Sequence, residues 1–309
     1  QVGAQAMADR YAYVPLIGIF IILAWGISGL LEKWDQRKKA LPIAGGVVIL
    51  VLMVVAWVQA GQWKNSITVF KHAISVTKNQ YPSFAVVYDN LGYALAKKGD
   101  IGEAITHYKT AIKINPNYAN TYNNLGSVLA RQEILKEAIT RYKTAIKINP
   151  NFAKAYNNLG HALQEKGDIG AAITHYKTAI KINPNLVKAY INLGAILSRI
   201  SQFEEAKTHY KEAIRVKPNS HTAYYNLANT LSRQGDMEKA ITHYKTAIKI
   251  NPIYPQAHVN LGTLLAQQGN LKEAINSFQE ALRLKPNLIL ARKNLEMAIR
   301  EYGQAGKSK

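Results

Sequence analysis

One polar residue recurs through most of the chain at a fixed spacing of 34 positions. It is an asparagine that directly precedes a leucine, at Asn90, Asn124, Asn158, Asn192, Asn226 and Asn260. A carboxamide offers a hydrogen-bond donor and an acceptor, so a row of them can hold an extended peptide by its backbone without reading its sequence. We predict peptide binding for these six residues, which we call the asparagine row. The alternative is that each asparagine only bonds locally.

A second recurring set has the residue type that binds metals. His107, His175, His209 and His243 share one position of the same 34-residue pattern. Equivalent positions on stacked helices lie on the order of 10 Å apart, whereas a zinc–nitrogen bond is about 2 Å long. We therefore expect these histidines to be surface residues that bind no metal.

The chain offers little else for catalysis. It has 309 residues and no cysteine, which excludes a disulfide framework, a cysteine-ligated metal site and a cysteine nucleophile. No HExxH, GxGxxG, phosphate-loop or nucleophile motif occurs in it. The sequence predicts no catalytic residue, no metal and no cofactor.

The asparagine row belongs to a longer repeating pattern. The same 34-residue step relates six prolines, namely Pro116, Pro150, Pro184, Pro218, Pro252 and Pro286. Alanines recur from Ala104 to Ala274, and aromatic residues from Tyr108 to Phe278. The pattern predicts two helices per repeat, with a leucine-glycine pair that allows close helix contact and a proline that ends the second helix.

The turn between the two helices has its own signature. Lys98-Gly99-Asp100 and its counterparts place glycine at the end of one helix and aspartate at the start of the next. Glu103 follows Asp100 at the third position, which predicts a capping box in the first repeat.

These residues resemble the tetratricopeptide repeat (TPR), whose 34-residue pattern combines an aromatic residue, Leu-Gly, Ala, a second aromatic residue, Ala and Pro. The resemblance covers six repeats, at 85–118, 119–152, 153–186, 187–220, 221–254 and 255–288. It implies an all-α fold, a right-handed solenoid of helix pairs whose concave side is lined mainly by the first helix of each pair. The row is also similar to the asparagine ladder of O-GlcNAc transferase, which implies protein or peptide partners.

Two segments flank the repeats. We predict that residues 64–84 form a half-repeat helix that links the repeats to the preceding segment. Residues 289–309 predict a polar capping helix and a tail that shield the last repeat.

Residues 1–63 form a membrane segment in our interpretation. Two uncharged runs predict transmembrane helices at about 11–31 and 40–63; a buried helical hairpin is the alternative. The loop between them carries Lys33, Arg37, Lys38 and Lys39, so the positive-inside rule places it in the cytoplasm. We expect an integral membrane protein, of a bacterial inner membrane, with the repeats on the non-cytoplasmic side.

The charge is strongly basic, with 39 Lys and Arg against 19 Asp and Glu. Many of these cations recur on the second helix of each repeat, so a solvated convex face is the preferred interpretation. Membrane lipids, anionic headgroups, acidic polymers and acidic proteins stay open as partners. Nucleic acid would require the opposite topology and is not expected.

The N-terminal residues Asp9, Arg10, Tyr11, Tyr13 and Pro15 resemble a signature of the transmembrane-and-TPR O-mannosyltransferases, which are GT-C glycosyltransferases. That resemblance implies a polyprenyl-phosphate sugar donor and catalytic acids in an early loop that this chain lacks. Arg10 could contact a lipid-linked phosphate, or could simply pair with Asp9. Because the chain begins with Gln1, it either starts at Met7 or is the tail of a longer protein.

Together these observations predict a membrane-anchored TPR module that binds extended polypeptide on its concave face, as the C-terminal part of a GT-C protein O-glycosyltransferase. The alternative is a non-enzymatic, membrane-tethered scaffold for an envelope protein complex.

Overall fold

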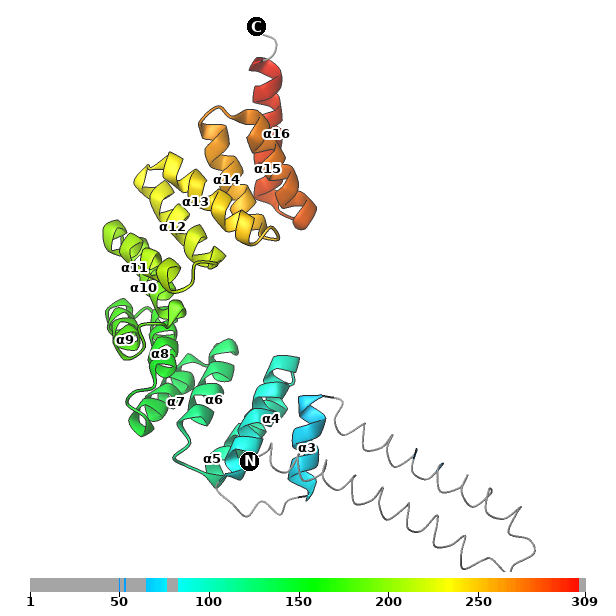
Figure 1. The fold of residues 1–309 in the computed structure, drawn as a ribbon, viewed down its shortest axis with the longest axis vertical. Coiled ribbons are helices and arrows are strands. Elements are labelled where there is room, and N and C mark those ends of the chain that lie inside the picture. Colours follow the sequence, from blue (N-terminus) through cyan, green and yellow to red (C-terminus); the bar gives the residue numbers. More distant parts are fainter. Residues whose placement is uncertain (1–49, 51–52, 54–64, 77–82, 306–309) are drawn as a thin grey trace, which may run out of the picture. The chain divides into compact units, whose positions relative to one another are not determined.

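The computed structural model describes residues 50, 53, 65–76 and 83–305 (Figure 1). Arg10 and nearly all of the predicted transmembrane helices at about 11–31 and 40–63 lie outside the described residues. Within the described part, no helix combines the length and apolar composition that a bilayer crossing requires.

The described residues are all helical apart from the turns that connect the helices, which confirms the predicted all-α class for this part of the chain. The chain divides into two compact units, 1–128 and 129–309. The first unit contains α3 (Ser66–Val76), α4 (Phe84–Lys98), α5 (Ile101–Ile114) and most of α6 (Ala119–Arg131). Within it, α3 packs against α4 and α4 against α5.

The second unit is a run of consecutive helices. They are α7 (Leu135–Ile148), α8 (Ala153–Glu165), α9 (Ile169–Ile182), α10 (Val187–Arg199), α11 (Phe203–Val216), α12 (His221–Gln234), α13 (Met237–Ile250), α14 (Pro255–Gln267), α15 (Leu271–Leu284) and α16 (Ile289–Ala305). We call the even-numbered ones helices A and the odd-numbered ones helices B. Each helix packs against the next, and α10 also contacts the helices A on both sides, α8 and α12 (Figure 1).

Close contact inside the pairs α10–α11 and α14–α15 depends on glycine, as the sequence predicts; α12 has Ala228 at the same position. A Cβ added to Gly194 in α10 would lie 2.7 Å from Cε1 of Tyr210 in α11. The same addition at Gly262 would lie 2.8 Å from Cε1 of Phe278. Both aromatic rings are almost completely buried, so the missing methyl groups of helix A make room for the rings of helix B.

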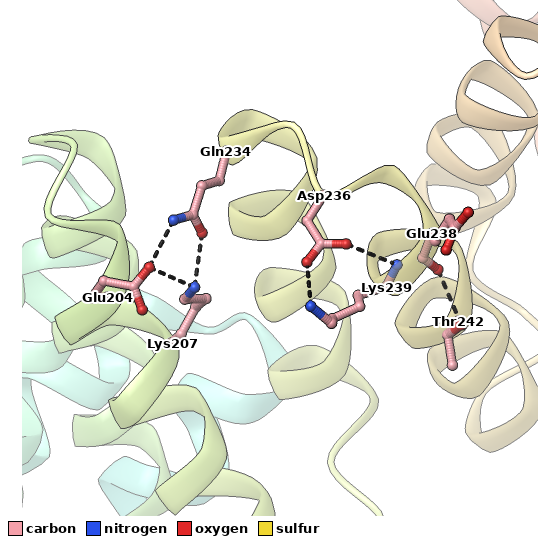
Figure 2. Close-up of polar contacts among 7 residues, drawn as sticks. All are labelled: Glu204, Lys207, Gln234, Asp236, Glu238, Lys239 and Thr242. Atoms are coloured by element: carbon pink, nitrogen blue, oxygen red, sulfur yellow. Dashed lines mark hydrogen bonds and ion pairs between the residues drawn. The ribbon is translucent and has the colours of Figure 1, made fainter.

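The predicted turns are confirmed in two repeats of the second unit. Gly167 and Gly235 have φ angles of +92° and +91°, a left-handed conformation that glycine adopts without steric cost. Oδ1 of Asp236 accepts a hydrogen bond from the backbone nitrogen of Lys239 at 3.3 Å (Figure 2). Asp168 makes the equivalent bond with Ala171.

The capping box predicted at Asp100 and Glu103 is wrong. The Asp100 side chain makes no cap hydrogen bond and instead accepts one from Nζ of Lys98 at 2.8 Å. A lysine two positions away offers the carboxylate a full positive charge, and this ion pair replaces the bond to the helix end.

Polar side chains also connect successive repeats. Figure 2 shows Lys207 in α11 donating to Oε1 of Glu204 at 2.7 Å and to Oε1 of Gln234, at the end of α12, at 2.8 Å. Nε2 of Gln234 in turn donates to Oε1 of Glu204 at 2.7 Å. The hydrogen bond from Lys207 is the main reason why the pKa of Glu204 is lowered. Because Glu204 is exposed, this cluster adds little stability and mainly fixes how α12 meets α11.

The last helix, α16, differs from the polar capping helix that the sequence predicts. It exposes Leu290, Met297, Ile299 and Tyr302. The 34-residue spacing makes α16 the next helix A after α14, but no helix B follows it among the described residues. Ile299 is 49% exposed, whereas Leu265, its equivalent in α14, is 2% exposed because α15 covers it.

Candidate functional site

An open groove of about 950 Å³ crosses the helix A surface of the second unit. Its walls come from α10, α12, α14 and α16, and Tyr210 and Tyr244 of the helices B contribute to its lining. Asn226, Asn260 and Asn294 also line it, one from each of three successive helices A. We call it the α10–α16 groove.

All six residues of the asparagine row are half-buried. The first unit holds Asn90 and Asn124, and the second unit holds Asn158, Asn192, Asn226 and Asn260. The structure therefore places the last two of these in the groove and gives each residue of the row partial access to solvent.

In the second unit the carboxamides are only partly used by the protein. Nδ2 of Asn192 donates to Oδ1 of Asn157 at 3.0 Å. Nδ2 of Asn260 donates to Oδ1 of Asn229 at 3.0 Å and to the Tyr225 hydroxyl at 3.2 Å. Within the described residues, Oδ1 of both side chains receives no hydrogen bond, and the Asn226 carboxamide has no partner.

Other members of the row are tied more closely to their neighbours. Nδ2 of Asn124 donates to Asp89, and its Oδ1 accepts from Asn123 at 3.4 Å. Oδ1 of Asn158 accepts from Asn157 at 3.2 Å. The local interpretation thus describes Asn124 well, whereas Asn226 and Asn260 retain free hydrogen-bonding capacity.

One further member of the row was not predicted from the sequence. Asn294 lies one repeat step after Asn260 and is also followed by leucine. Its Nδ2 donates to Oγ1 of Thr263 at 3.2 Å, in the preceding helix A. The predicted repeats end soon after the last proline of the pattern, Pro286, although the asparagine-leucine pair continues into α16.

Two arginines in the groove were not predicted either. Arg199 ends α10, Arg233 lies next to the end of α12 at the equivalent repeat position, and both line the groove. Nη1 of Arg233 donates to the backbone oxygen of Ser198 at 2.7 Å, and its guanidinium carbon lies 5.2 Å from the centroid of the Phe203 ring. Among the residues that line the groove, all within the described chain, none is Asp or Glu.

Aromatic side chains cluster beside the groove. The rings of Tyr225 and Tyr254 have centroids 4.8 Å apart, and those of Tyr225 and Tyr244 are 5.8 Å apart. The Tyr244 hydroxyl donates to Oδ1 of Asn229 at 2.5 Å. Burial raises the pKa of Tyr254 to about 12 and also raises the pKa of Tyr244, so these two phenols stay neutral near pH 7 and act as hydrogen-bonding groups.

The recurring histidines are not the surface residues that we expected. Each ring is half-buried and lies against a tyrosine of helix A in its own repeat, as His175 does against Tyr156 with centroids 5.8 Å apart. His243 and Tyr224 form the equivalent pair at 5.9 Å. Burial lowers the pKa of His175 and His243, which favours the neutral rings and a packing role.

Two family models match the chain. Residues 92–133 and 134–167 match a model described as TPR repeat. Residues 151–219 and 219–287 match a model described as tetratricopeptide repeat. Together the matches run from residue 92 to residue 287. They include the groove-lining residues of α10, α12 and α14, but not those of α16.

Curated relatives match a shorter region. Protein O-mannosyl-transferase TMTC4 of Homo sapiens is 29% identical over 102 residues, which cover 33% of this chain and 13% of the relative. Protein O-mannosyl-transferase TMTC1 of Homo sapiens is 32% identical over 113 residues, covering 36% of this chain and 12% of the relative. The matched region is therefore a small part of each relative.

Solved structures share the fold. The APC/C hetero-tetramer Cut9-Hcn1 matches with a TM-score of 0.65 and 17% identity, over 76% of this chain and 46% of that chain. PilW, described as a widely conserved type IV pilus biogenesis factor, matches with a TM-score of 0.63 and 17% identity, over 68% of this chain and 98% of that chain. At these identities the likeness concerns the helical solenoid alone.

Proposed function

Because this chain belongs to the tetratricopeptide repeat family of protein-interaction modules, we propose that its helix A surface binds an extended polypeptide through the peptide backbone. The proposal assigns the contacts to Asn90, Asn124, Asn158, Asn192, Asn226 and Asn260, and adds Asn294. The observation that carries it is the free hydrogen-bonding capacity of Asn192, Asn226 and Asn260 beside or within an open groove.

The spacing of the row suits an extended chain. Adjacent packed helices lie about 10 Å apart, and an extended peptide rises about 3.3 Å per residue. One carboxamide therefore meets the peptide backbone about every third residue. A carboxamide oxygen accepts from a peptide N–H whatever the side chain, so the row confers affinity with little sequence selection.

The test is peptide binding by paired asparagine variants. Asn226→Ala with Asn260→Ala should weaken the binding of an uncharged, extended peptide about tenfold, because two hydrogen bonds are lost. Asn158→Ala with Asn192→Ala should act in the same direction. Asn276→Ala is the matched control, since Asn276 is exposed on α15 and away from the row. Unchanged binding by both paired variants, with helicity and melting preserved, would contradict the proposal.

We further propose that the module is anchored in a membrane and serves a protein O-glycosyltransferase of the GT-C class. The O-mannosyl-transferase relatives, the two uncharged N-terminal runs and the Asp9 to Pro15 signature support this. Peptide captured by the repeats would then be presented as acceptor, and Arg10 would contact the phosphate of a lipid-linked sugar. The repeats would lie on the non-cytoplasmic side, in a bacterial inner membrane.

The mass of the natural protein in its own membranes tests this second proposal. An antibody raised against the repeats should detect a band well above the 34.3 kDa of this chain, because the catalytic spans would precede this segment. A band at the mass of this chain alone would instead favour a membrane-tethered scaffold for an envelope complex. Protease added outside spheroplasts should digest the repeats, and protection of the repeats would reverse the proposed topology.

A further inference from the structure

We infer that the α10–α16 groove selects polypeptides that carry a carboxylate, which Arg199 and Arg233 bind at its edge. This inference rests on the proposed function, because it names the class of peptide that the same surface prefers. It goes beyond the asparagine row, whose carboxamides are neutral and bind any backbone equally.

Arg233 is already held in place for such a contact. One of its nitrogens donates to the backbone oxygen and, at 3.3 Å, to the hydroxyl of Ser198, and the Phe203 ring lies under the guanidinium. These contacts use Nη1, so Nη2 and Nε stay available for the two oxygens of a carboxylate. A guanidinium fixed by packing loses less side-chain entropy on binding than a free one.

Arg199 supplies the second cation. It is exposed, lines the groove and has no acidic partner within the described residues. Arg199 and Arg233 occupy equivalent positions on neighbouring helices A, about 10 Å apart. Two carboxylates a few residues apart on an extended peptide would reach both.

The charges around Arg199 and Arg233 favour a carboxylate-binding role for these arginines over a role as cations that only contact solvent. Arg215 and Arg283, on the helices B, are neutralised by Glu212 at 2.7 Å and Glu280 at 2.6 Å. No acid is among the described residues that line the groove, so the two groove arginines lack such partners there. The equivalent position holds Glu165 and Gln267 in the two adjoining repeats and Arg131 in the repeat before Glu165. Within the second unit, Arg199 and Arg233 are therefore the basic residues that occupy this position in successive repeats.

The carboxylate can come from an acidic side chain or from the C-terminus of the peptide, and the test separates the two sources. Three twelve-residue peptides share one uncharged sequence. The first is acetylated and amidated, the second has two glutamates three residues apart and the same blocked ends, and the third has a free C-terminal carboxylate. Binding to the purified full chain is measured by fluorescence anisotropy at 150 mM and 500 mM salt.

We expect the glutamate peptide or the free-carboxylate peptide to bind about tenfold or more tightly than the blocked neutral peptide. Arg199→Gln with Arg233→Gln should remove this preference, so that the carboxylate peptides bind no more tightly than the blocked neutral peptide does to the same variant. Arg199→Gln alone should remove part of it, and no described hydrogen bond or ion pair inside the protein depends on that side chain. Glutamine is the residue that the protein itself uses at 267.

The control removes the same charge elsewhere. Lys143→Gln with Lys211→Gln neutralises two exposed lysines on α7 and α11 and should keep the preference. If this control loses as much preference as the arginine variant, general attraction to a basic protein explains the result and the inference is overturned. If all three peptides bind equally, the inference fails while the proposed function stands. If no peptide binds, both fail.

Discussion

Asn124 in α6 donates from Nδ2 to both carboxylate oxygens of Asp89 in α4, at 3.2 Å each. Asp89 is 4% exposed, and burial raises its pKa although hydrogen bonds from Asn124 and Thr121 oppose the rise. The equivalent positions in the next two repeats hold Asn123 and Asn157. A carboxylate therefore occupies a place where the neighbouring repeats use a neutral carboxamide.

Asp89 should consequently contribute more stability to the first unit in mild acid than at neutral pH, against the opposite contribution of His107, whose pKa burial lowers. The folded-state pKa of Asp89 is above its unfolded value, so its contribution to stability is complete below the unfolded value, 3.8, and is lost as the pH rises through the folded value. Asp89→Asn should remove this dependence and slow hydrogen exchange of the α4 amides at pH 7. Asp100→Asn, at a partly exposed acid of the same unit, should leave the dependence intact. Identical exchange in wild type and Asp89→Asn at pH 7 would refute the argument.

The histidines of the second unit predict the opposite dependence. Burial lowers the pKa of His175 and His243, and Lys143 and Lys211 lower them further against the weaker effects of Asp168 and Asp236. The unfolded chain then binds more protons, so stability falls as the pH drops below the ordinary histidine value of 6.5 toward the folded value.

Replacing both rings tests this. The free energy of unfolding in urea should fall less between pH 7.5 and 5.5 for His175→Gln with His243→Gln than for wild type. His221→Gln provides a control, because His221 is not one of the recurring histidines and its ring packs against Tyr254 instead. Equal pH dependence in the wild type and the double variant would show that His175 and His243 do not titrate in this range.

The parts of the fold that follow from short-range pattern were predictable from the sequence. The glycine opposite a helix B aromatic residue and the glycine in a turn both meet a steric requirement that acts within one repeat, as Gly194 and Gly235 illustrate. The asparagine register was equally predictable. Its hydrogen-bond partners were not, because they depend on the residue 35 positions earlier, which changes from Asn157 to Tyr225 between repeats.

The groove itself could not be predicted because it arises between repeats rather than within one. The repeat position of Arg199 and Arg233 also holds Lys97 and Arg131, but Glu165 and Gln267 interrupt the series, and the sequence does not show which of these cations line a groove. The histidines misled us for a related reason. A polar residue on helix B suggests exposure, whereas the tyrosine of helix A in the same repeat covers one face of the ring.

Gly194 and Gly170 should respond in opposite ways to the same substitution. Gly194→Ala places a Cβ 2.7 Å from the Tyr210 ring and should destabilise the second unit by about 1–3 kcal/mol through overpacking. Gly170→Ala meets nothing within 4 Å and should stabilise α9 by up to about 1 kcal/mol, because alanine favours the helix. Urea unfolding of both variants measures the difference, and equal shifts would refute the packing argument.

Ser201 stands where the neighbouring repeats of this unit turn with glycine. Its φ angle is +62°, and that of Gly235 is +91°. This left-handed conformation costs a residue with a Cβ about 1 kcal/mol or more of folding free energy. Ser201→Gly should therefore raise the free energy of unfolding by about 1 kcal/mol, after allowance for the greater freedom of glycine in the unfolded chain. The reverse change, Gly235→Ser, should lower it by a similar amount. A loss of stability in Ser201→Gly would mean that the serine side chain stabilises the turn.

The length of a bound peptide tests the geometry of the asparagine row most directly. In the second unit, Asn158, Asn192, Asn226, Asn260 and Asn294 are separated by four repeat steps of about 10 Å each, and an extended peptide covers about 40 Å with about twelve residues. Affinity for uncharged peptides should rise with length up to about twelve residues and change little beyond it. Asn294→Ala should shorten this optimum by about three residues, because the last contact is lost, whereas Asn276→Ala should leave it unchanged. A length dependence that continues smoothly well past this optimum, or one that ignores Asn294, would contradict a discrete row of backbone contacts.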